Sequence, residues 1–449
     1  MASISWALRR INDNPLSMVD RAMVERVCGQ NHYQWRQREL DPATTLALFM
    51  QQVLHGNAPC SEVRHIAGRS FTAQAYCNAR ARLPLAVYHS LLSEMYGQIT
   101  PHTSRAEHRW FGHRTFHIDG STFSMPDTPE LQKAFGMPSS QSQGCGFPVA
   151  HLLVLFSAAT GLLIDMWASS LWTGDLAQTP EAHLHLDAGD LLIGDDFYSG
   201  YPHLAMLKKQ GLHGLFPVHH LRIVDFKKNR PYCGEGHEAV AGMPRSRWIK
   251  SLGKEDQLVE YFKPRQGPTW MAPSDYAALP DSIVVREMRR TVVRPGLGKI
   301  TLTLVTTLSD PVKYPAQELL DLRLRRWDVE TNIGHLKTTM KMDVLRCKSE
   351  QGVRKELSIF ALVYNLVRVV MLQAARRQSV AVSRISFADA YKWMRHAGPG
   401  EVLPPLIINP RRPDRIEPRC RKRRPKKYPL MISPRAVLRK LLKNKRKKA

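Results

Sequence analysis

Three carboxylates follow or lie within apolar segments, and their placement constrains the fold more than any other feature of the chain. Asp119 follows the short alternating segment 114–118, and Asp195 follows the compact apolar segment 191–194. Glu330 lies in a third segment, whose residues recur at helical spacing. Three acids on separate elements of one domain can hold two divalent cations, and two cations can support in-line displacement at phosphorus.

Each aspartate also has a purely structural explanation. An Asp-Gly pair such as Asp119-Gly120 is common in turns. Asp195 can cap the helix that is expected to begin near Tyr201. Asp195 and Asp196 are adjacent, and neighbours in a strand point to opposite faces, so only one of them can share a site with Asp119. We take Asp195 as the ligand and Asp196 as the alternative.

Four charged residues step along the third segment at intervals of three, four and seven: Arg323, Arg326, Glu330 and Lys337. On a helix these intervals place all four near one face. A solvated ladder of ion pairs is the usual explanation of such a pattern. A metal ligand flanked by phosphate-binding cations is the functional alternative.

The charge of the chain points to a polyanionic partner. Its 449 residues are 43% hydrophobic, enough for a large core, and carry a net charge of +26. Such an excess favours nucleic acid, because each neutralised phosphate releases counterions. Residues 410–449 contain 18 lysines and arginines against 2 acidic residues, a net charge of +16, which leaves +10 on the rest. If this tail contacts DNA, its deletion should flatten the salt dependence of binding; a solvated charge run is the alternative.

The seven cysteines are odd in number and contain no CxxC pair, which argues against a disulfide framework or a structural zinc site. Reduced thiols in a cytosol-like compartment fit this pattern. The start of the chain lacks the apolar core of a signal peptide, and no stretch reaches ~18 uninterrupted apolar residues. The histidines, including the adjacent pair His219-His220, indicate no metal set.

The first part of the chain is expected to be helical, with helices over 42–54, 61–67 and 71–83. The last of these carries Arg80 and Arg82. A helix, a turn and a second helix with exposed arginines resemble a helix-turn-helix, so we take both arginines as candidate DNA contacts. An ordinary helical bundle is an equally good explanation.

The middle of the chain predicts an α/β domain. The apolar run 151–168 is interrupted by a Thr-Gly pair and predicts a β-hairpin, and 201–211 predicts a helix that ends at glycine. A hairpin, a strand and a helix, with aspartates at the first and last strand ends, are what a ribonuclease-H-like core would show. Residues 356–377 predict a long buried helix. Strands are expected in a β-rich insertion at 214–218, 257–262, 282–288 and 299–308.

The expected division of the chain into domains has five parts. They are a helical N-terminal DNA-binding region (1–105), the first part of a catalytic core (106–211), a β-rich insertion (212–312), the helical remainder of the core (313–398) and a basic C-terminal tail (399–449).

The segment around Glu330 resembles the Y-x-x-R-x-x-x-E-x-x-x-x-x-x-K signature of DDE transposases of the insertion sequence four (IS-four) family. Arg326, Glu330 and Lys337 match R, E and K in register. Arg323 stands where that family usually has tyrosine, and an arginine there can also hold a phosphate.

Two upstream blocks extend the resemblance. The segment 194–201 is similar to the family's second-aspartate block, with Asp195 on the catalytic aspartate and Asp196 in place of the usual arginine. The segment 117–122 resembles the first-aspartate block, which contains Asp119. The long interval between the second aspartate and the glutamate is where the family carries a β-rich insertion.

The resemblance implies an enzyme that cleaves DNA at the ends of an insertion sequence and transfers the 3′-OH ends into target DNA. In this reading Asp119, Asp195 and Glu330 would ligate two Mg²⁺ (or Mn²⁺), and Arg326 and Lys337 would hold phosphates at the transposon end.

The resemblance also implies double-stranded DNA as the partner, a homodimer on paired ends, and a bacterial cytoplasmic protein associated with the nucleoid. Some relatives cut through a DNA hairpin and stack a flipped base on an aromatic residue. Trp248 and Trp270 are candidates for that role, although a packing role is commoner for tryptophan. Two other functions remain open: a metal-dependent nuclease on the same core, and an inactive DNA-binding protein encoded by the element.

Overall fold

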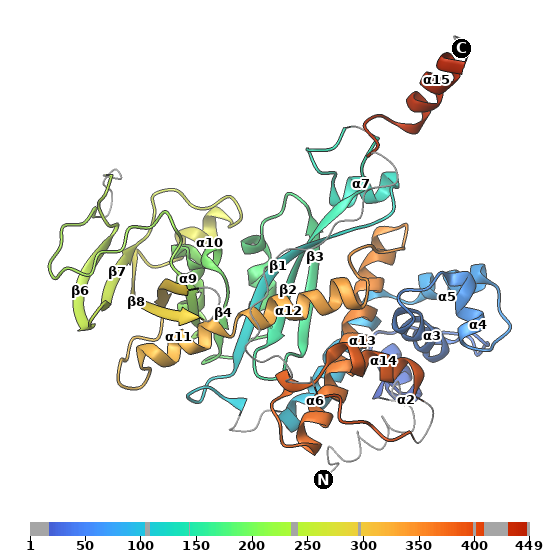
Figure 1. Ribbon diagram of the computed structural model, residues 1–449, viewed down its shortest axis with the longest axis horizontal. Coiled ribbons are helices and arrows are strands. Elements are labelled where there is room, and N and C mark those ends of the chain that lie inside the picture. The colour runs from blue at the N-terminus through green and yellow to red at the C-terminus, as the bar shows by residue number, and fades with distance from the viewer. Residues whose placement is uncertain are drawn as a thin grey trace.

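A nine-stranded mixed sheet forms the centre of the molecule (Figure 1), with the strand order β3-β2-β1-β4-β5-β9-β8-β7-β6. The computed structural model describes residues 18–103, 108–142, 144–234, 241–294, 298–397, 401–407 and 430–446. The chain is therefore a mixed α/β protein with a group of helices at its N-terminal end.

The first five strands make up one half of the sheet. They are β1 (Thr115–Ser124), β2 (Val149–Ser157), β3 (Leu163–Ser170), β4 (Leu191–Ile193) and β5 (His213–Pro217). β2 runs antiparallel to both β1 and β3, whereas β4 runs parallel to β1 and to β5. The hairpin expected from the apolar run 151–168 is confirmed as β2 and β3, and Gly161 turns between them with a φ of 68°.

The β-rich segment extends this same sheet. Its strands are β6 (Ser246–Gly253), β7 (Asp256–Phe262), β8 (Ser282–Arg294) and β9 (Gly298–Thr306). β9 pairs antiparallel with β5, so β5 lies between β4 and the added strands. β6 was not expected from the sequence, because most of its residues face solvent and it lacks a buried alternating pattern. A buried ion pair between Arg286 and Asp256 stabilises the middle of this segment. The Nε and Nη2 of Arg286 donate to the Asp256 carboxylate, and its Nη1 donates to the Tyr314 carbonyl.

Five described helices precede the sheet: α2 (Arg21–Gln30), α3 (Pro42–Leu54), α4 (Cys60–Ile66), α5 (Ala73–Arg82) and α6 (Leu85–Thr103). The three helices expected from the sequence correspond to α3, α4 and α5. Asp41 caps α3 by accepting a hydrogen bond from the Thr44 N–H at 2.8 Å, and Pro42 opens the helix. Local signals therefore set this part of the fold.

The long helix α13 (Glu350–Arg377) joins the N-terminal helices to the sheet, since it packs against α3, α6 and β3. By length and composition it could cross a membrane, but 94% of its most apolar stretch is buried inside the protein. Asn365 fastens its centre to the sheet by accepting from the Leu163 N–H and donating to the Leu163 carbonyl, both at 2.8 Å. The expected buried helix at 356–377 is confirmed.

The segment that carries Arg323, Arg326, Glu330 and Lys337 is helical, but it is not the one helix that was expected to set all four near one face, and this is a correction. The chain forms α11 (Ala316–Leu324), then α12 (Trp327–Gly334), then a π-helical turn, η5 (His335–Thr339). Between α11 and α12 the Arg326 N–H donates to the Arg323 carbonyl at 3.1 Å, a step of three residues that tightens the chain. The four charged residues of this segment therefore reach the site from different elements.

The remaining described helices are α7 (Pro129–Phe135), η3 (Asp175–Gln178), α8 (Thr179–His183), η4 (Asp196–Ser199), α9 (Tyr201–Lys209), α10 (Pro273–Ala277), η6 (Val382–Arg384), α14 (Phe387–His396) and α15 (Arg435–Arg446).

Candidate catalytic site

The register between β1 and β4 brings the two aspartates to one edge of the sheet. The parallel pairing sets His117 opposite Ile193, and Asp119 and Asp195 each lie two residues beyond these partners. Asp119 is still inside β1 and only 8% exposed. Asp195 lies past the end of β4 and caps η4, accepting from the Phe197 N–H at 3.0 Å. Asp195 thus lies beside Asp119 as expected, but its capping role is not the expected one: it caps η4, whereas Gly200 precedes α9 at Tyr201 and offers no side-chain cap.

Arg326 joins the first and third acids. Its Nη2 lies 3.0 Å from the Asp119 Oδ2, and its Nη1 lies 3.0 Å from the Glu330 Oε1. The arginine side chain is 11% exposed, whereas the Glu330 side chain is 45% exposed. α12 lies against β1, as Figure 1 shows, so the acid on the helix faces the acid on the strand across one guanidinium.

Two further cations lie beside the acids. The Lys337 Nζ donates to the Ser121 Oγ at 3.1 Å, two residues from Asp119 on β1. Arg323 is 9% exposed, and the charges of Asp195 and Asp119 act on it. Burial and the neighbouring Arg326 lower the pKa of Arg323 to about 10. The structure therefore brings together all three predicted acids and all three cations of the segment.

Burial raises the pKa values of both aspartates of the site, although cations lie beside them. Burial raises the pKa of Asp119 to about 6; Arg326 opposes this rise and Asp195 adds to it. Burial also raises the pKa of Asp195, against the Phe197 N–H and Arg326. His117 adds no cation, because burial and Arg326 lower its pKa to about 3. A bound cation would stabilise the ionised forms of these aspartates.

A fourth carboxylate belongs to this group and was missed from the sequence. Asp175 Oδ1 lies 3.1 Å from the His151 Nδ1, and a Cβ added to Gly120 would lie 2.3 Å from the Asp175 Oδ2. Burial raises the pKa of Asp175, with the charge of His151 opposing and that of Asp195 adding. Asp175 opens η3, five residues after β3 ends, so it did not follow an apolar segment directly. The available signal was Gly120, which leaves room beside Asp119 for another side chain.

The two arginines predicted on the N-terminal helices lie apart from the acids and differ from each other. Arg80 is 9% exposed; its guanidinium lies 3.6 Å from the centroid of the Phe49 ring and donates to Gln52 and to the Cys347 Sγ at 3.1 and 2.9 Å. The expected DNA contact of Arg80 is corrected accordingly, because a side chain enclosed in this way stabilises the packing of helices. Arg82 is exposed at the end of α5.

Asp196 has a separate set of neighbours. Ligand atoms of Asp196, His219 and His220 lie within 4.8 Å of one another, although the sequence indicated no metal set among the histidines. Trp248 and Trp270 are both half-buried, and their role in stacking a base stays a prediction. The stretch 408–429 of the basic tail lies outside the described residues.

The donor set fits a hard divalent cation. All the acids offer carboxylate oxygens, which Mg²⁺ and Mn²⁺ prefer. Burial raises the pKa of Asp119 and of Asp195, and a cation beside them would stabilise their ionised forms. Carboxylates from β1, from just past the end of β4 and from α12, with arginine and lysine beside them, are the arrangement expected of a phosphoryl-transfer enzyme that uses metal ions.

The comparisons with known proteins agree with this class. The profile of the family described as "Transposase DDE domain" matches residues 110–366, more than half of the chain, and the chain belongs to this family. It is a DDE transposase, an enzyme of DNA phosphoryl transfer, and the family implies use of a divalent metal.

One curated relative and one solved structure are similar over most of the chain. The transposase InsG for insertion sequence element IS4 of Escherichia coli (strain K12) is 26% identical over 407 residues, covering 86% of this chain and 84% of the relative. The cryo-EM structure of the piggyBac transposase synaptic complex with hairpin DNA matches with a TM-score of 0.42 and 7% identity, covering 86% of this chain and 80% of that chain.

Proposed function

We propose that this transposase cleaves DNA at the ends of an insertion sequence and joins the freed 3′-OH ends to target DNA. The observation that carries the proposal is that the Arg326 guanidinium bonds to both Asp119 and Glu330, while its charge also acts on Asp195. The similarity to a transposase of an insertion sequence element over most of both chains supports the choice of substrate.

The acids divide the work by their positions. Asp119 and Asp195, at one edge of the sheet, and Glu330, on α12, are proposed to hold two divalent ions. Two such ions, when bound, activate the attacking water or 3′-OH and stabilise the leaving oxygen. Glu330 is the most exposed of the three, so it can adjust when DNA enters.

The basic residues are proposed to hold the DNA strand. Arg326 already lies among carboxylates and can turn one of its nitrogens to a phosphate once a cation balances Asp119. Lys337 lies at the rim of the same edge, near Ser121, and suits a phosphate beside the scissile bond. Arg323 is buried, so its proposed role is to balance the charge of Asp195.

The proposal also covers the fold of the core, the assembly and the location in the cell. The antiparallel strands β1, β2 and β3 beside the parallel strands β4 and β5 support a ribonuclease-H-like core interrupted by a β-rich insertion. A homodimer would hold two DNA ends for one joining event, with the N-terminal region and the basic tail binding DNA. The free thiols of Cys28, Cys60, Cys77 and Cys347 suit the bacterial cytoplasm, where the nucleoid lies.

A strand-transfer assay tests the proposal. Purified protein is mixed with DNA carrying the ends of its own element and a target plasmid, in Mg²⁺ or in EDTA. We expect cleavage and joining that require the metal, and loss of both in Glu330→Gln and Asp119→Asn while DNA binding persists.

The matched control is Glu401→Gln, which removes one carboxylate far along the sequence from the site. Cleavage without joining would replace the proposal by a metal-dependent nuclease. Specific binding of the ends with no cleavage in Mg²⁺ or Mn²⁺ would replace it by an inactive DNA-binding protein.

A further inference from the structure

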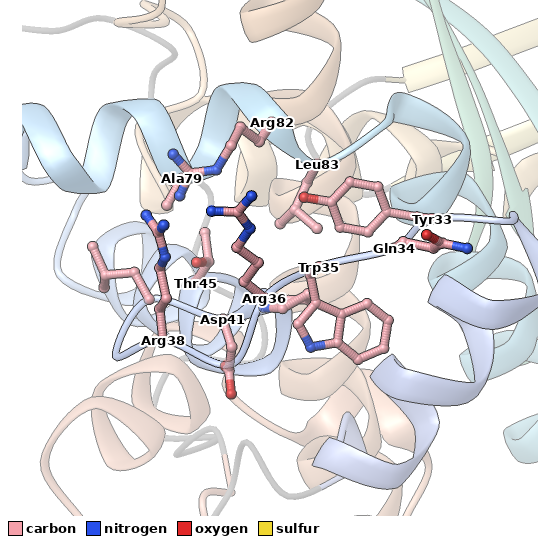
Figure 2. Close-up of a pocket in the computed structure, with 12 residues that line it drawn as sticks. Tyr33, Gln34, Trp35, Arg36, Arg38, Asp41, Thr45, Ala79, Arg82 and Leu83 are labelled. Carbon is pink, nitrogen blue, oxygen red and sulfur yellow. The ribbon is translucent and has the colours of Figure 1, made fainter.

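A cavity of about 300 Å³ opens between the N-terminal helices, apart from the carboxylates. It is lined by the connection between α2 and α3, by the start of α3 and by the end of α5. Figure 2 shows the guanidinium groups of Arg36, Arg38 and Arg82 pointing toward one another, with the rings of Tyr33 and Trp35 beside them. The cavity is large enough for one nucleotide.

Arg36, Arg38 and Arg82 are exposed, and their side chains form no hydrogen bond or ion pair within the part of the chain that the structure describes. The acid that lines the cavity, Asp41, is already engaged: it accepts from the Arg21 Nη1 at 2.6 Å and from the Thr44 N–H. Three like charges around one opening repel each other, and a phosphate between them would remove that repulsion.

The aromatic side of the cavity is held in place by packing. The rings of Tyr33 and Trp35 stack with centroids 6.3 Å apart and an angle of 16° between their planes. Both are half-buried and pack against the core that α13 shares with the N-terminal helices. An indole fixed in this way offers a flat surface to a sugar or a base at little cost in side-chain entropy.

We propose that this cavity binds one nucleotide of a DNA strand, with the arginines on its phosphate and Trp35 against its sugar or base. The proposal rests on the proposed function, which makes DNA the substrate, and adds a binding site that shares no residue with the carboxylate site. A strand fits better than a free nucleotide, because the arginines lie at an exposed opening that a continuous backbone can cross. Arg82 ends α5, so the cavity also gives the second helix of the helix-turn-helix-like pair a defined contact.

Binding without catalysis tests the site. The full-length protein with Glu330→Gln serves as the parent, and fluorescence anisotropy follows its binding to a labelled duplex of the element's end, in EDTA, over a range of salt concentrations. The triple variant Arg36→Ala, Arg38→Ala, Arg82→Ala is compared with a control that removes three exposed arginines of α13 and α14. The control substitutions are Arg376→Ala, Arg377→Ala and Arg395→Ala.

We expect the pocket triple variant to bind roughly 30- to 100-fold more weakly, and the slope of log K against log salt to fall by about 3. The control should change affinity by less than about threefold. Trp35→Ala should weaken binding roughly tenfold, and Trp35→Phe should restore most of it. Circular dichroism checks that each variant is folded, and Arg82→Ala alone, at an exposed helix end, should lower the slope by about 1.

Other outcomes overturn the inference in distinguishable ways. If the parent binds DNA and the triple variant binds as the control does, the cavity is not a DNA site, while the proposed function stands. If deoxyadenosine monophosphate binds, is lost in the triple variant, and DNA affinity is unchanged, the cavity takes a free nucleotide instead of a strand. If the parent binds no DNA at any salt concentration, the proposed function fails together with the inference.

Discussion

Arg326 in the carboxylate site and Arg36 in the N-terminal cavity carry the same charge in opposite surroundings. Arg326 is nearly buried and pairs with two acids at 3.0 Å, whereas Arg36 is exposed and has no acidic partner among the described residues. The first site gathers four carboxylates and three cationic side chains, whereas the only acid among the described residues that line the second, Asp41, already pairs with Arg21. This difference in surrounding charge favours the binding of cations at the first site and of phosphate at the second.

The largest effect that would test this contrast is expected for Arg326→Ala. Arg326 lowers the pKa of Asp119, so its removal should raise that pKa further above about 6. Joining activity at pH 7 should fall by about 100-fold, and the midpoint of its rise with pH should move to higher pH. Single-turnover strand transfer measured against pH at fixed Mg²⁺ checks this. Arg36→Ala is the matched control, and an equal shift of the midpoint in both variants would remove the distinction between the sites.

Asp119→Asn should separate stability from activity. The pKa of Asp119 in the folded protein, about 6, lies above its value in the unfolded chain. The contribution of the protonated carboxyl to stability is therefore fully present below about pH 4, and it is lost as the pH rises through 6. At pH 7.5 in EDTA the ionised group therefore costs stability, and the variant should be more stable by about 2 kcal/mol. Urea unfolding at pH 7.5 and at pH 4.5 measures the difference, which should shrink at the lower pH. A variant less stable than wild type at pH 7.5 would show that the ion pair with Arg326 outweighs the burial.

Gly120→Ala should show whether Asp175 works with the other acids. The new Cβ would meet the Asp175 carboxylate, the movable end of its side chain, so the fold should survive while that carboxylate is displaced. We expect joining to fall about tenfold in Gly120→Ala and in Asp175→Asn, and little further in the double variant, because both changes remove the same contact. Effects that multiply in the double variant would place Asp175 outside the site. Gly174→Ala, where an added Cβ meets nothing within 4 Å, is the matched control.

The smallest effect is expected for Ser121→Ala. The hydroxyl accepts from Lys337 at 3.1 Å, and a hydrogen bond to a half-buried ammonium contributes about 1 kcal/mol or less. Joining should fall by roughly two- to fivefold, mainly through weaker DNA binding. A loss as large as that of Arg326→Ala would mean that Ser121 orients Lys337 for the reaction itself, and Ser124→Ala on the same strand is the control.

The chain's local signals predicted much of the fold. The apolar run with a glycine turn gave the β2–β3 hairpin, Asp41 and Pro42 marked the start of α3, and the apolar pattern of 356–377 gave most of α13. β6 was missed because a solvent-exposed strand needs no apolar alternation. The expectation of one helix that sets Arg323, Arg326, Glu330 and Lys337 near one face was wrong. The chain turns tightly at Arg326, which bonds to Asp119 on β1, and no local pattern records that contact.

The candidate site shows the same division. The acids Asp119, Asp195 and Glu330 were proposed from their places beside apolar segments and from a resemblance, and the structure brings them together. Arg80 gives the opposite result. The sequence suggested an exposed arginine that could contact DNA, yet the Arg80 guanidinium packs on the Phe49 ring inside the protein. Whether a helical arginine faces solvent depends on which other elements cover it.

The sequence by itself determined the basic character of the chain and the candidate acids, because charge and apolar patterning can be read along the chain. It indicated the class of protein through the resemblance of its motifs to those of a known family. Only the tertiary structure decided that Asp175 joins the acids, that Arg326 bridges Asp119 and Glu330, and that Arg36, Arg38 and Arg82 surround one cavity. These groups come from elements far apart in the chain. Their charges interact strongly only at short range, so their chemistry depends on how the sheet and helices pack.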